Sequence, residues 1–122
     1  MASKKNDNGK ADAIESATTP SDRGERRVIV RTKGPAGVHY GTLIDYVDHG
    51  EVATVTLVQS RRLWHWRIEQ PGSTGSISDL AVHGPGAGSR IAPTVPRVVV
   101  QGACEVVDCT REAADAIDGW GR

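Results

Sequence analysis

The chain has 122 residues, which suits one domain of ordinary size and leaves no room for two. Its 15 Lys and Arg residues balance its 15 Asp and Glu residues, so the formal net charge is zero. Proteins that bind duplex DNA normally carry a basic surplus, because phosphate neutralisation dominates their affinity. The charge balance therefore disfavours binding of duplex nucleic acid, although a local basic patch could still hold a small anion.

The sequence also bears on the compartment in which the protein works. No apolar run approaches the length of a membrane span, and residues 1–20 lack the apolar stretch of a signal peptide. Cys104 and Cys109 are too far apart for a CxxC pair, and the chain has no other cysteine. We expect reduced, mostly buried thiols rather than a disulfide, and a cytoplasmic protein without a membrane partner.

Residues 1–26 differ in composition from the rest of the chain. They contain a single Ile among small, polar and charged side chains, too little apolar surface to offset the entropy of ordering. We expect a disordered polar arm here, followed by a single α+β domain over residues 27–122. The alternative is a short arm that docks on a sister subunit through Ile14.

The domain itself is rich in predicted strands. Short runs with β-branched residues alternate with turns that contain Gly, Pro or Asp, a pattern typical of an antiparallel meander. The last two runs are separated only by Gly102, so they could also form one bent strand. The expected strands are 27–32, 39–46, 51–58, 61–68, 97–101 and 103–108.

Two short helices complete the prediction. Ser76 and Asp79 fit a capping box at the start of a helix that Gly84 ends. Thr110 is a good N-cap for a second helix over 111–118, which ends at Gly119. The fold class is therefore α+β: an antiparallel, strand-rich domain with about six short strands and two short helices.

The segment 61–68 (RRLWHWRI) is the most unusual part of the chain. Period-two alternation places Arg62, Trp64 and Trp66 on one face of the strand. In one interpretation both Trp rings fill the core of a chain that lacks Phe. In the other, one ring stacks on a base while Arg61 or Arg62 pairs with phosphate, which the planar guanidinium suits. Adjacent arginines point to opposite faces, so at least one should face solvent or a ligand.

No motif in the sequence supports catalysis. The loop 84–90 (GPGAGSR) lacks the Lys-Ser/Thr pair of a phosphate-binding loop and the strand–helix context of a dinucleotide fingerprint. It could still form an anion-binding nest, with a plain turn as the alternative. The four histidines lack metal-ligand spacing, and neither cysteine has an activating partner. We expect no enzyme activity, no metal and no cofactor.

Several segments together resemble a known family. RVIVRT, AGVHYGTL, RRLWHW, SISDLAVHGPG and a strand that ends in DCT before a helix follow one another in the order seen in a family of small phage-encoded proteins. The resemblance runs from about Arg27 to Trp120. The chain is also similar to the first Thoeris anti-defence family of phages, whose members are sponges that bind a cyclic ADP-ribose signal without cleaving it.

The resemblance implies a homo-oligomer that holds its ligand at subunit interfaces through aromatic and Arg side chains. The loop 84–90 departs from the family pattern in being richer in glycine and in lacking an Asn, which puts an adenine-reading amide there in doubt. Carried over to this sequence, the candidate ligand-binding residues are Arg61, Arg62, Trp64, Trp66, His83, Ser89 and Arg90.

The expected function is sequestration of a cyclic nucleotide-derived immune signal, either a cyclic ADP-ribose isomer or a cyclic oligonucleotide, by a phage protein in the host cytoplasm. The main alternative is a non-enzymatic phage accessory protein or protein–protein interaction module. An enzyme acting on a nucleotide is a third reading, against which the missing general base counts. The strand-rich domain has several edges, and the apolar strand 97–101 lacks Pro or Lys protection, so we expect a dimer or a larger closed homo-oligomer.

Overall fold

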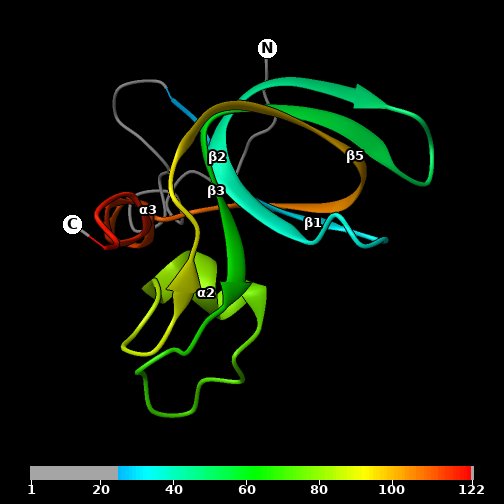
Figure 1. The fold of residues 1–122 in the computed structure, drawn as a ribbon. Helices are drawn as coiled ribbons and strands as arrows, with labels where there is room; N and C mark the ends of the chain where they lie inside the picture. The colour runs from blue at the N-terminus through cyan, green and yellow to red at the C-terminus, as the bar shows by residue number, and fades with distance from the viewer. Residues whose placement is uncertain (1–24, 122) are drawn as a thin grey trace.

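The computed structural model describes residues 25–121 and shows an antiparallel, strand-rich α+β fold (Figure 1). The predicted fold class is confirmed. Residues 1–24, most of the expected arm, lie outside the described residues. The elements are β1 (Arg27–Thr32), β2 (Val38–Asp48), β3 (Ala53–His65), α2 (Ile77–His83), β4 (Arg90–Ile91), β5 (Val95–Asp108) and α3 (Arg111–Asp118).

The four long strands close into a small barrel. β1 pairs with β2 and β2 with β3, which gives the predicted antiparallel meander. β5 then pairs with both β1 and β3, so the order β2-β1-β5-β3 returns to β2. Arg97–Val100 pair with β3 on one side, whereas β1 pairs only with Ala103–Asp108, so no described strand pairs with the other side of 97–101.

The strands are fewer and longer than expected. The predicted strands 51–58 and 61–68 are joined into β3, because the chain between them makes a bulge at Gln59 (φ 50°) rather than a turn. Gly41 packs against this bulge, where an added Cβ would lie 3.0 Å from the Cβ of Leu57. β5 is one strand bent at Gly102 (φ 75°), as the alternative prediction had it.

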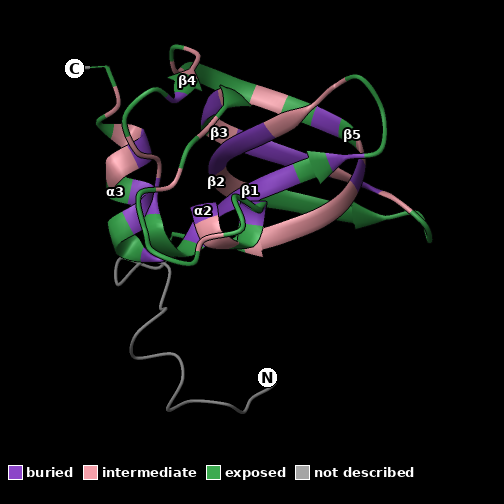
Figure 2. Ribbon diagram, turned by 90° about the horizontal axis from the view of Figure 1, so that it is seen from below, coloured by how far each residue is buried: buried purple, intermediate pink, exposed green. Residues whose placement is uncertain are grey.

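Alternate residues of β1 serve two separate cores. Val28 and Val30 point into the barrel together with Val55, Leu57 and Val100, and all five are buried. The residue between them, Ile29, points out of the barrel toward a second core that α2 and α3 complete. Figure 2 shows buried residues along the strands and in both helices. The second core contains Ile29, Tyr40, Leu63, Ile77, Leu80, Ala81, Cys109, Ala113, Ala114 and Ile117.

Ser76 and Thr110 are the N-caps of α2 and α3, as predicted, but the capping box expected at Ser76 forms only in part. The Ser76 hydroxyl accepts a hydrogen bond from the Asp79 N–H, but the Asp79 carboxylate turns away and accepts from Ser73 and Thr74 instead. The reciprocal half of the expected capping box is therefore missing. Thr110 caps α3 by accepting from the Ala113 N–H. Neither of the described helices is long and apolar enough to cross a membrane.

Candidate functional site

Arg62 and Trp64 lie together on the face of β3 that is turned away from the helices. Leu63 between them is buried in the helix-side core, so the alternation of the strand turns its two neighbours to the opposite face. Trp64 is 64% exposed, and the guanidinium carbon of Arg62 lies 5.4 Å from the centroid of its ring. At this distance the cation and the ring face attract each other and hold both side chains in place.

The two side chains form one wall of a groove of about 350 Å³. His39 of β2 is the direct cross-strand neighbour of Arg62, and Ser60 lies two residues before it on β3. The opposite wall comes from the segment between β4 and β5 and from β5 itself. The groove is lined by His39, Ser60, Arg62, Trp64, Ala92, Pro93, Val95 and Val98, which we call the Trp64 groove.

Two nearly buried polar side chains lie in the Trp64 groove. Ser60 is 1% exposed and His39 is 3% exposed. No hydrogen bond to the Ser60 hydroxyl or to the His39 Nδ1 is made within the described part of the chain. Neither atom is a fully buried polar atom without a partner, so both are open to the groove, where a ligand could bond to them.

The state of the His39 ring follows from its surroundings. Nε2 lies 2.8 Å from the carbonyl oxygen of Ala36, so in the neutral ring Nε2–H donates and Nδ1 is left as an acceptor. Burial lowers the pKa of His39 below its usual value, and the nearby Arg62 charge adds to this effect against the opposing Ala36 bond. The ring is therefore neutral at pH 7 and offers an acceptor.

Arg61, in contrast, has a structural role. It is 6% exposed, and its side chain lies under the C-terminal end of α3. Its Nη1 donates to the carbonyl oxygens of Ile117 at 2.7 Å and Trp120 at 2.9 Å, and its Nε donates to Ala92 at 2.7 Å. Carbonyls at the end of a helix lack partners within the helix, and a cation there is favourable. Arg61 stabilises the fold and is not available to a ligand.

The prediction that Trp66 lies on the same face of the strand as Trp64 is wrong. β3 ends at His65, so the alternation stops before Trp66. The ring packs against the helix-side core, and its Nε1–H donates to the carbonyl oxygen of Gly75 at 3.0 Å. Trp66 therefore packs at the core, as the first interpretation had it, whereas Trp64 does not.

The polar groups of the glycine-rich loop 84–90 are hydrogen-bonded within the domain. The Ser89 hydroxyl accepts from the Arg67 N–H and donates to the Gly86 carbonyl. The Gly86 N–H donates to the Arg67 carbonyl, and the Ser89 N–H donates to the Gly86 carbonyl. The Ala87 N–H donates to the Glu69 carboxylate. With these N–H groups engaged, the loop is a folded turn rather than an open anion nest.

The remaining predicted residues lie apart from the groove. His83 is exposed in the last turn of α2, and Arg90 is exposed on β4 beside His65. The structure therefore brings together only Arg62 and Trp64 of the predicted set. Sequence reasoning missed His39 and Ser60, because their place beside Arg62 depends on the β2–β3 register and on the bulge at Gln59.

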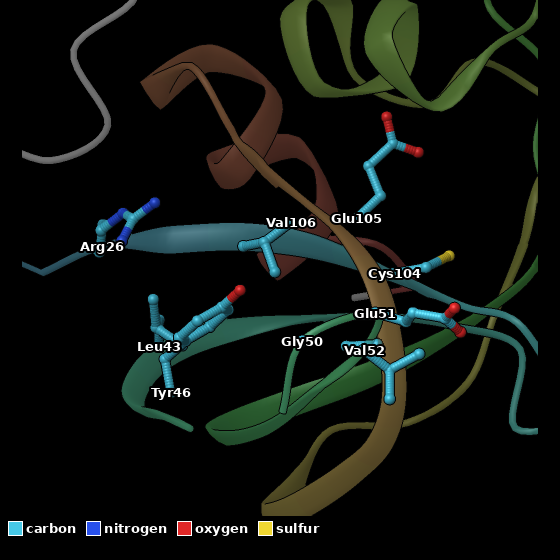
Figure 3. A pocket seen from close by; sticks show the side chains of 10 residues that line it. Arg26, Leu43, Tyr46, Gly50, Glu51, Val52, Cys104, Glu105 and Val106 are labelled. Carbon is cyan, nitrogen blue, oxygen red and sulfur yellow. The ribbon is translucent and has the colours of Figure 1, made fainter. Parts of the chain in front are cut away.

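A second, larger concavity of about 500 Å³ lies at the β2–β3 hairpin (Figure 3). Its charged groups are already paired: Arg26 lies 2.8 Å from Asp108, and Glu105 lies 2.9 Å from Arg31. It therefore suits a small anion less well than the Trp64 groove does. We call it the hairpin cavity; it is lined by Arg26, Leu43, Tyr46, Gly50, Glu51, Val52, Ala103, Cys104, Glu105 and Val106.

The described residues include no group of three or more His, Cys, Asp or Glu side chains that could hold a metal ion. What they form is a small antiparallel β-barrel, backed by two helices, with two concave surfaces on its strands.

Residues 25–117 match the model of a family described as a domain of unknown function, DUF6948, and the chain belongs to this family. No curated protein and no solved structure matches the chain.

Proposed function

We propose that this protein binds a small nucleotide-derived anion in the Trp64 groove and sequesters it without cleaving it. The observation that carries the proposal is the convergence of an exposed aromatic ring, a guanidinium and two unpartnered polar groups on one groove. Its volume of about 350 Å³ lies within the range of small-molecule sites.

Each group has a role that matches one part of a nucleotide. The exposed face of Trp64 offers a stacking surface for a base, which contributes about 1–3 kcal/mol. Arg62 supplies charge-assisted hydrogen bonds for phosphate oxygens. His39 and Ser60 can bond to polar atoms of the base or sugar. Binding alone lowers the free concentration of a signal, so a sponge needs no general base or nucleophile.

The sequence resemblance suggests the ligand class and the setting. A cyclic ADP-ribose isomer or a cyclic oligonucleotide carries both the aromatic base and the phosphate that the groove can accept. We propose a phage anti-defence protein that acts in the host cytoplasm as a homo-oligomer. No nucleic-acid duplex is required, in keeping with the zero net charge.

Calorimetric titration of cyclic ADP-ribose isomers and cyclic dinucleotides tests the proposal. We expect Arg62→Ala to weaken binding by roughly ten- to more than a hundredfold, which corresponds to about 1.5–3 kcal/mol for a charge-assisted bond. Trp64→Ala should weaken it by a similar factor. Arg90→Ala is the matched control, because Arg90 is an exposed arginine outside the groove lining.

Mass spectrometry of the released ligand should show that it is intact. The proposal is wrong if no ligand of this class binds the wild type, or if Arg90→Ala weakens binding as much as Arg62→Ala. A cleaved ligand would contradict sequestration and indicate an enzyme.

The second candidate is a protein–protein interaction module. Large apolar side chains are exposed on β2, among them Ile44, Tyr46 and Val47. Such a surface is unusual in a domain that acts through a small ligand alone.

A further inference from the structure

β2 runs well beyond the end of β1. The last ladder pair between the two strands is Arg27 with Thr42, followed by one hydrogen bond from the Leu43 N–H to the Arg26 carbonyl at 2.7 Å. Asp45–Asp48 then pair with β3 on one side only, after a register shift at Ile44. On the other side, no described strand covers them. Figure 1 shows this part of the β2–β3 hairpin projecting past the rest of the sheet.

This free edge is only partly protected against pairing. Natural proteins blunt exposed edges with Pro, charged residues such as Lys, bulges or a covering segment. Residues 44–48 (IDYVD) contain neither Pro nor Lys, and their protection consists of Asp45, Asp48 and the register shift between Leu43 and Asp45. Ile44 is 54% exposed, Tyr46 51% and Val47 44%. Figure 2 shows the projecting end of the hairpin as exposed. The edge therefore offers both unpaired backbone groups and apolar side chains.

The hairpin cavity lies beside this edge. Tyr46 is directly opposite Val55 in the ladder, so both side chains lie on the same face of the β2–β3 pair. Leu43, Val52 and Val106 add apolar surface to the cavity lining (Figure 3). A strand added to the edge could place side chains in the cavity, the arrangement by which sheets bind extended peptides.

The charge of the hairpin indicates which kind of strand can bind at the free edge. Residues 44–52 carry the carboxylates of Asp45, Asp48 and Glu51 and no Lys or Arg. Glu51 lies 3.8 Å from Lys33, whereas Asp45 makes no ion pair within the described part of the chain. A second copy, paired antiparallel with the same edge, would bring like charges together. A basic strand would meet opposite charges.

We propose that the free edge of β2 at residues 44–48, with the hairpin cavity, is a docking site for an extended peptide segment of a partner protein in which basic and apolar residues alternate. Backbone hydrogen bonds to the edge provide the attachment. The carboxylates and the cavity select basic and apolar side chains respectively. This surface shares no lining residue with the Trp64 groove, so the two sites are independent.

The test uses the full chain and three labelled peptides followed by fluorescence anisotropy. The first alternates Val and Arg, the second alternates Val and Glu, and the third repeats the first with N-methyl groups on alternate amides. We expect the Val–Arg peptide to bind and the other two to bind at least tenfold more weakly. Hydrogen exchange at residues 44–48 should slow when the first peptide is added.

Variants locate the site. The His49 N–H bonds to the Val52 carbonyl, so by alternation the N–H of Tyr46 faces the free edge. Tyr46→Pro removes this donor and should abolish the slowed exchange. Asp45→Lys should weaken binding at least tenfold. Glu112→Lys is the matched control, because Glu112 is an exposed carboxylate on α3 and should leave binding unchanged. Melting curves confirm that each variant is folded, and Trp64→Ala should bind the peptide as the wild type does.

Several results would overturn the proposal. Equal binding of the Val–Arg and Val–Glu peptides would show that charge does not select the partner. Unchanged binding of the N-methylated peptide would exclude strand addition. Protection of 44–48 without peptide that grows with protein concentration would assign the edge to a second copy. The same protection, lost on deletion of residues 1–24, would assign it to the chain's own N-terminal residues.

Discussion

At the scale of single residues, two adjacent arginines have opposite roles. β3 alternates, so Arg61 points toward the end of α3 while Arg62 lies beside Trp64 on the face turned away from the helices. Arg61 is buried with hydrogen-bonded partners, and Arg62 remains partly exposed. An arginine can be buried when its donors are satisfied, which accounts for the first case.

The pair gives a direct test by mutation. We expect Arg61→Ala to lower the free energy of unfolding by about 2–3 kcal/mol, because it removes the donor from the carbonyls of Ile117 and Trp120. Arg62→Ala should change it by less than about 0.5 kcal/mol, as for other partly exposed side chains. Urea unfolding measures both, and equal losses would contradict the assignment of roles.

The two thiols should also differ in reactivity. Cys109 is fully buried, and burial raises its pKa to about 12, so almost no thiolate forms at pH 8. Cys104 is partly exposed. We expect iodoacetamide at pH 8 to modify Cys104 in the folded protein and Cys109 only after denaturation, as read by peptide mass spectrometry. Modification of both at similar rates would mean that the helix-side core opens easily.

At the scale of elements, α3 is the helix most strongly tied to the barrel. A helix this short is unstable alone and depends on tertiary contacts. Its C-terminal end is held by Arg61 and by Arg27, whose Nη1 lies 2.7 Å from the Asp118 carboxylate. The buried Tyr40 hydroxyl donates to the same carboxylate at 2.9 Å. Its N-terminal end is held by Thr110.

Thr110 connects both helices, so its loss should be costly. Its hydroxyl accepts from the Ala113 N–H and donates to the Val82 carbonyl at 2.8 Å. We expect Thr110→Ala to lower stability by about 1–2 kcal/mol, which for a domain of this size shifts the melting temperature by roughly 4–16 °C. Thr110→Ser keeps the hydroxyl and should retain most of the stability. A serine variant as unstable as the alanine variant would show that the methyl group, not the cap, is important.

At the scale of the whole molecule, the barrel closes without residues 1–24. The strands that close it begin at Arg27, and their pairings join residues 27–108. We predict that the domain folds without residues 1–24, because that segment carries too little apolar surface to add to a core.

Truncation tests this directly. We expect a chain that starts at Glu25 to melt within a few degrees of the full chain. A chain that starts at Arg27 should be slightly less stable, since it loses the Arg26–Leu43 backbone bond and the exposed Arg26–Asp108 pair, which is worth about 0–1 kcal/mol. A large drop for the first truncation would mean that the arm packs against the domain.

The sequence by itself determined the local features of this protein. Helix caps at Ser76 and Thr110, the strand at 27–32 and the bend at Gly102 all follow from interactions between residues close together in the chain. The fold class follows from the same short-range signals.

Only the tertiary structure decided which side chains are available to a ligand. Alternation shows that Arg61 and Arg62 point to opposite faces, but not which face is covered by α3. The meeting of His39 with Arg62, and the pairing of β5 with both β1 and β3, join residues far apart in the chain. Such contacts depend on register and barrel closure, which arise from burial of the whole sheet and not from any local pattern.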